Sequence, residues 1–150
     1  MSQWSIRPAT DEDAAAVAHV LIGSRRANLG SVPPLKRSDA EVHAWVRTML
    51  LLEREVWVVD VGRVVGVLAL DAEWLDQLYL LPEYAGQGIG AALLDLAKVL
   101  RPDGFGLWVF VSNTGAQRFY ERHGLVEVER TDGAGNDERV PDIHYTWVPA

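Results

Sequence analysis

The most constraining stretch of the sequence is a glycine-rich turn within residues 78–94. An apolar run ends at Pro82, and glycines follow at positions 86, 88 and 90. Beyond them, apolar residues recur with helical spacing, which predicts a strand leading into the start of a helix. Glycines let a ligand approach the backbone closely, and the free amides of a first helical turn attract phosphate groups. We therefore expect this turn to bind a phosphate or a pyrophosphate.

Composition and charge limit the remaining options. A length of 150 residues fits a single domain, 1–150, and 14 basic against 21 acidic residues give a net charge of −7. This charge argues against nucleic acid or an anionic membrane as a partner and favours cations such as amines. No cysteine is present, which excludes thiol nucleophiles, and the four histidines show no paired metal spacing. We expect no signal sequence and no membrane helix, and hence a cytoplasmic protein.

The hydrophobic pattern predicts the element order β-α-α-β-β-β-α-β-α-β-β. A capping box of Ser38 and Glu41 begins the second helix. Leu78 and Leu80 alternate strictly while Leu75 is out of step with them, which predicts a β-bulge near residues 76–77. The expected strands are 4–7, 55–60, 63–70, 73–81, 105–111, 125–131 and 143–148. The expected helices are one ending near residues 29–30, one starting after Ser38, 89–100 and 114–123.

Two phosphate-binding motifs fit this turn poorly. Gly86, Gly88 and Ala91 match the dinucleotide pattern G-x-G-x-x-A. That fold requires the turn after its first strand and an acidic residue at the end of the next strand, whereas the next strand here ends in residues 111–113. A Walker loop is excluded because no lysine follows Gly90.

The turn and the element order together resemble the GNAT acetyltransferase superfamily over nearly the whole chain. Residues 78–94 are similar to its acyl-CoA motif, and residues 107–124 are similar to a second motif that contains Asn113 and Phe-Tyr-Glu-Arg-x-Gly. The resemblance implies a single α/β (α+β) domain with a mixed, mostly antiparallel sheet whose central strands splay apart. It also implies an N-acetyltransferase that takes acetyl-CoA as co-substrate, uses no metal and transfers the acetyl group directly to a primary amine.

The same resemblance implies a set of cofactor-binding residues. Backbone groups of two leucines would pair with the pantetheine arm, and the amides of the glycine turn would hold the pyrophosphate. The candidates are Leu78, Leu80, Gly86, Gln87, Gly88, Ile89, Gly90, Ala91 and Asn113. The chain departs from the family at Ala85, where the family usually has Arg or Gln. Arg118 and Arg122 are candidates to replace that contact.

The catalytic candidates are one acid and two alternative bases. Tyr120 matches the family's common general acid, which protonates the departing CoA thiolate. The amine must lose a proton, for which Glu73 and Asp76 are the candidates. The expected bulge favours Asp76 because it re-aims side chains, whereas alignment with the family favours Glu73. The choice between them stays open.

The acceptor is expected to be a small-molecule amine, bordered by residues 24–29 and by the loop 131–142. One alternative is a protein N-terminus or lysine, which needs an open groove beside the bulged strand. Another is a non-catalytic acyl-CoA-binding regulatory module, which Ala85 favours. The oligomeric state is open, with a homodimer as one option.

Overall fold

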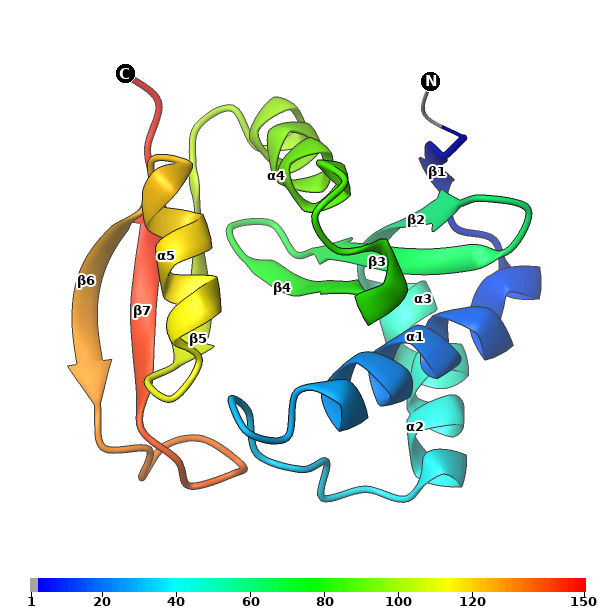
Figure 1. Cartoon of the computed structure of the whole chain (residues 1–150), viewed down its shortest axis with the longest axis horizontal. Coiled ribbons are helices and arrows are strands. Elements are labelled where there is room, and N and C mark those ends of the chain that lie inside the picture. The colour runs from blue at the N-terminus through cyan, green and yellow to red at the C-terminus, as the bar shows by residue number, and fades with distance from the viewer. Residues whose placement is uncertain (1–2) are drawn as a thin grey trace.

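The chain folds into two sheets flanked by helices (Figure 1), as described by a computed structural model of residues 3–150. The first sheet has the order β1-β2-β3-β4 and the second the order β5-β7-β6, with every paired neighbour antiparallel. The element order and the mixed α/β class agree with the sequence prediction. The strands are β1 (Ser5–Pro8), β2 (Glu55–Asp60), β3 (Val64–Leu70), β4 (Leu75–Leu80), β5 (Phe105–Phe110), β6 (Val126–Thr131) and β7 (Asp142–Trp147).

Helices cover both faces of the first sheet and one face of the second (Figure 1). Every residue of β3 is buried, as expected for a strand covered on both faces. Within residues 3–150, no helix is long and apolar enough to cross a membrane. The helices are α1 (Ala14–Ala27), α2 (Asp39–Trp45), which continues through one π turn (Val46–Leu50) into α3 (Leu51–Glu53), α4 (Ile89–Leu100) and α5 (Thr114–Arg122); 3-10 turns lie at Asp11–Asp13 and Pro82–Tyr84.

Local sequence signals explain where several helices begin and end. Ser38 and Glu41 form the expected capping box at the start of α2. The side chain of Asn113 accepts a hydrogen bond from the Ala116 amide at 3.2 Å and so caps α5. The first helix ends at Ala27, earlier than predicted, because the Asn28 side chain donates to the carbonyl of Ser24 at 2.7 Å.

The predicted β-bulge is present in β4. Ala69 pairs with Gln77 and Leu70 pairs with Leu75, so Asp76 is the extra residue. The predicted strand 73–81 is wrong at its start, because the amide of Asp71 donates to the carbonyl of Trp74 at 2.8 Å. This tight turn occupies residues 71–74 and leaves Glu73 outside β4.

The two sheets meet at one point between β4 and β5. Trp74 and Gly106 form an isolated parallel bridge, in which the Gly106 amide donates to the carbonyl of Glu73 at 3.0 Å. Among the described residues, β4 and β5 form no further ladder and belong to separate sheets. The predicted splay of the central strands is therefore confirmed, and the strands separate beyond this bridge.

We expect Gly106→Ala to destabilise the fold, because a Cβ there would lie 2.8 Å from Nε2 of His144 and 2.9 Å from the ring of Trp74. Overpacking of two aromatic rings should lower the free energy of unfolding by ~1–3 kcal/mol, measured by urea denaturation. Gly115→Ala is the control, because a Cβ at that helical position meets no atom within 4 Å. Equal stability of both variants would contradict the expectation.

Candidate functional site

Two adjoining cavities lie where β4 and β5 separate. The splay cavity, of about 220 Å³, lies between the two strands and is also lined by α1 and α5. The outer cavity, of about 650 Å³, lies between α1, α2, the loop before α2 and the loop between β6 and β7. The residues that line both cavities are Arg25, Asp76, Gln77, Tyr79, Trp108 and Phe110. A molecule in one cavity can therefore reach a molecule in the other.

The backbone of β4 presents free polar groups to the splay cavity. The Leu81 amide donates to the carbonyl of Val65 at 2.9 Å, which marks these two residues as a hydrogen-bonded pair. Bonded and non-bonded pairs alternate in an antiparallel ladder, so Leu78 and Leu80 occupy non-bonded positions opposite β3. Their amides and carbonyls point away from β3 and toward β5.

The glycine turn after β4 leaves a row of amides free at the start of α4. Gly86 and Gly88 have φ angles of 77° and 82°, a backbone conformation that residues with a side chain rarely adopt. Gly88 is the N-cap of α4 and supplies no side chain, and within residues 3–150 the amides of Gln87 to Ala91 have no acceptor. Such a turn can bind an anionic group. Arg118 and Arg122, the candidates to replace the basic contact missing at Ala85, are both exposed on α5.

Tyr120 lines the splay cavity from α5. Its side chain is buried among aromatic rings, with Phe119 at 5.3 Å and Tyr145 at 6.4 Å between ring centroids. Burial raises the pKa of the Tyr120 hydroxyl, and proximity to Tyr79 raises that pKa further. The hydroxyl forms no hydrogen bond with another residue of the described chain, so its proton is available to a ligand.

The structure separates the two candidate bases. Asp76 lines both cavities and lies 3.6 Å from Nε of Arg54. Glu73 lines a different cavity beside Trp74 and Arg101, on the other side of the bridge. The splay cavity thus brings together Tyr120, Asp76, Leu78, Leu80 and Asn113 from the predicted set, and it does not include Glu73.

Sequence reasoning missed Tyr79 as a central residue, and it included Arg25 only as part of segment 24–29. Arg25 is only 7% exposed, and its guanidinium donates to the carbonyl of Pro33 at 2.6 Å and to Glu138 at 3.0 Å. It also lies 3.5 Å from the hydroxyl of Tyr79 and 5.5 Å from the ring centroid of Phe110. Burial raises the pKa of Tyr79. The sequence did contain a signal for Arg25, because this charged residue follows Leu21 by four positions and so lies on the apolar face of α1.

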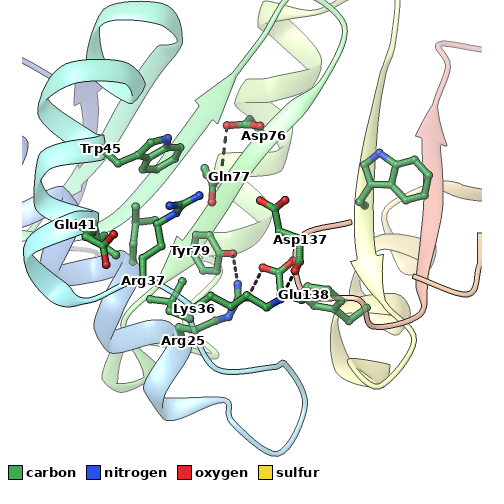
Figure 2. A pocket seen from close by; sticks show the side chains of 15 residues that line it. Arg25, Lys36, Arg37, Glu41, Trp45, Asp76, Gln77, Tyr79, Asp137 and Glu138 are labelled. Atoms are coloured by element: carbon green, nitrogen blue, oxygen red, sulfur yellow. Dashed lines mark hydrogen bonds and ion pairs between the residues drawn. The ribbon is translucent and has the colours of Figure 1, made fainter. Parts of the chain in front are cut away.

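The outer cavity is bounded by two loops that contact each other (Figure 2). The ammonium group of Lys36 donates to the backbone carbonyl of Asp137, and Arg25 pairs with Glu138 of the same loop. Arg25 of segment 24–29 and Asp137 and Glu138 of segment 131–142 thus line one cavity, and their role in bordering the acceptor stays a prediction. Trp45 and Trp108 add aromatic surface to this wall.

Comparison with known proteins identifies a family. The model of the acetyltransferase (GNAT) domain family matches residues 53–127. An uncharacterized N-acetyltransferase of Archaeoglobus fulgidus is 30% identical over 88% of this chain and 99% of its own length. A peptidyl-lysine N-acetyltransferase, YjaB of Salmonella typhimurium, is 36% identical over 55% of this chain. That match spans 57% of YjaB. A separate match to an uncharacterized N-acetyltransferase of Methanocaldococcus jannaschii is 33% identical and covers 48% of this chain and 38% of that protein.

Solved structures share the whole fold. The apo form of YjaB from Escherichia coli superposes with a TM-score of 0.78 at 24% identity, covering 100% of both chains. The PaiA N-acetyltransferase of Thermoplasma acidophilum, solved in complex with coenzyme A, gives a TM-score of 0.75 at 22% identity over 99% of both chains. At these identities the likeness establishes the fold.

Proposed function

Because the chain belongs to the GNAT family of acetyltransferases, we propose that it transfers an acetyl group from acetyl-CoA to the primary amine of a small molecule. The observation that carries this proposal is the meeting of the splay and outer cavities at Asp76, with Tyr120 lining the first of them. We propose that residues 1–150 perform this reaction as one domain.

The residues around the splay cavity suit an acyl-CoA. The outward-facing amides and carbonyls of Leu78 and Leu80 can pair with an extended amide-containing arm, in the manner of an added strand. The free amides from Gln87 to Ala91 can bind its pyrophosphate. PaiA, which shares the fold, was solved with coenzyme A, and this supports the proposal. Since Ala85 offers no charge, we infer that affinity depends mainly on backbone amides.

The proposed chemistry assigns opposite proton transfers to two side chains. When bound, acetyl-CoA supplies the acetyl group as a reactive thioester. Asp76 takes a proton from the amine nitrogen as the nitrogen forms its bond to the carbonyl carbon. Tyr120 donates its proton to the sulfur as the carbon–sulfur bond breaks, so the products are an amide and a free thiol. We favour Asp76 over Glu73 as the base because only Asp76 lines both cavities.

A small acceptor is supported by the contact between the two loops that bound the outer cavity. An extended peptide needs an open groove beside the bulge, whereas Lys36 and Arg25 connect these loops to each other. A second candidate acceptor is a lysine side chain of a protein, which the similarity to the peptidyl-lysine N-acetyltransferase YjaB favours. This alternative requires the two loops to separate. Release of CoA with peptides but with no small amine would support it.

We expect acetyl-CoA at about 100-fold excess over its Kd to stabilise the protein by ~2.7 kcal/mol, which raises Tm by roughly 5–10 °C. Gly88→Ala should abolish most of this shift, because alanine disfavours the φ of 82° that exposes the helix amides. Gly30→Ala is the matched control, since Gly30 has no positive φ and no neighbouring atom within 4 Å of an added Cβ. The absence of any thermal shift with the wild-type protein would refute the proposed function.

Tyr120→Phe should lower kcat by ~10²-fold or more while leaving the affinity for acetyl-CoA nearly unchanged, because only the proton donor is removed. Burial holds the pKa of Tyr120 above its ordinary value. The wild-type enzyme should therefore keep its acid protonated, and show no alkaline loss of kcat from this residue, up to pH ~10. Turnover and pH profiles from CoA release test both statements. Unchanged turnover in the variant would remove Tyr120 from the mechanism.

Asp76→Asn and Glu73→Gln distinguish the two candidate bases. We expect Asp76→Asn to lower kcat/KM by ~10²-fold or more below the pKa of the amine, where a base is needed. Glu73→Gln should stay near the wild-type value because Glu73 lines a separate cavity. The measurement is the pH dependence of kcat/KM for the three proteins. The reverse ranking would assign the base to Glu73.

A further inference from the structure

The outer cavity contains a cation that forms no hydrogen bond or ion pair within the described chain, although, after the hydrogen bonds with Ser38, its charge helps to lower the pKa of the Glu41 carboxyl in the same wall. Arg37 lies on the loop before α2 and lines this cavity, and it forms no hydrogen bond or ion pair with any of residues 3–150. The other two basic residues in the wall are engaged, Arg25 by Glu138 and Lys36 by the carbonyl of Asp137. The guanidinium of Arg37 is therefore the basic group left to bind a ligand.

Carboxylates face the same space from other elements. In Figure 2, Arg37 extends toward the middle of the cavity from one wall, while Asp76 and Asp137 lie on other walls. The side-chain carboxylate of Asp137 has no partner among residues 3–150, because only its backbone carbonyl receives Lys36. Asp76 lies at the junction with the splay cavity, where the reacting amine belongs under the proposed function. The cavity thus offers an acidic position for an ammonium group and a separate basic position.

We infer that the acceptor is a small amine that also carries a carboxylate, such as a free amino acid, and that Arg37 binds this carboxylate. The inference rests on the proposed function, because it specifies the acceptor of the same reaction. A guanidinium presents two parallel N–H donors that match a carboxylate, which gives both affinity and orientation. With the carboxylate held at Arg37, the amine of the same molecule can lie toward Asp76. The cavity volume of about 650 Å³ suits a molecule of this size.

Other amine classes fit this charge pattern less well. A monoamine with no second charged group offers no anion to the exposed Arg37 guanidinium, which would stay hydrated. A diamine could place its ammonium groups at Asp76 and Asp137, but it carries no carboxylate for the N–H donors of Arg37. A carboxylate-bearing amine satisfies both the basic and the acidic positions.

The experiment compares matched acceptors with matched variants. Free amino acids, their carboxamides and the diamine putrescine are assayed for release of CoA from acetyl-CoA. The wild-type protein should prefer the free amino acids over the carboxamides, and Arg37→Gln should raise KM for the amino acids by ~10-fold or more while changing the carboxamides little. Arg47→Gln is the control, since Arg47 is exposed on the π turn and lines neither cavity. Partial rescue by Arg37→Lys would support a charge interaction.

A second readout separates this inference from the proposed function. Calorimetric titration of amino acids into the CoA-saturated protein measures acceptor binding without turnover. Loss of binding in Arg37→Gln and its retention in Arg47→Gln would support the role of Arg37 even if no acceptor releases CoA, an outcome that would count against the proposed function. Equal rates with amino acids and carboxamides in the wild-type protein, a preference for putrescine, or unchanged KM and binding in Arg37→Gln would each overturn the inference.

Discussion

The isolated bridge between Trp74 and Gly106 is the constraint on which the site depends. Two parallel strands that continued their pairing would fill the space between them with hydrogen bonds. Here Gly106 leaves room for the rings of Trp74 and His144, whose centroids lie 5.0 Å apart, and Trp108 packs on His144 at 5.1 Å. This aromatic cluster joins the sheets at one end of β4 and β5. The strands can then separate at the other end without breaking the fold.

The β-bulge gives β4 two functions that a regular strand could not combine. A shift of one residue moves every following side chain to the opposite face of a strand. With Asp76 as the extra residue, Leu75 stays in the core at 6% exposure, while the non-bonded positions of Leu78 and Leu80 face the splay cavity. Asp76 itself is displaced to the junction of the two cavities. One irregular residue therefore sets both the backbone groups and the carboxylate that the proposed reaction uses.

Sequence reasoning recovered the features that depend on neighbouring residues. The capping box of Ser38 and Glu41, the bulge at Asp76, the glycine turn and the element order all follow from local spacing, and all are present. The contact between Arg25 and Glu138 joins residues 113 positions apart, and no local pattern specifies such a pair. Our preference for Asp76 over Glu73 as the proposed base likewise depends on the tight turn at 71–74, which leaves Glu73 outside β4 and which a strand pattern does not reveal. The roles of these residues in catalysis stay predictions.

Tyr120 and Asp76 lie in different surroundings, although both line the splay cavity. Tyr120 is buried among aromatic rings, and burial raises its pKa, so the neutral donor form is favoured. The side chain of Asp76 is 30% exposed, and its carboxylate lies 3.6 Å from Nε of Arg54. The splay of β4 and β5 thus leaves Tyr120 among buried aromatic rings and Asp76 at a partly exposed edge. The fold therefore holds the proposed acid on α5 and the proposed base on β4 before any substrate binds.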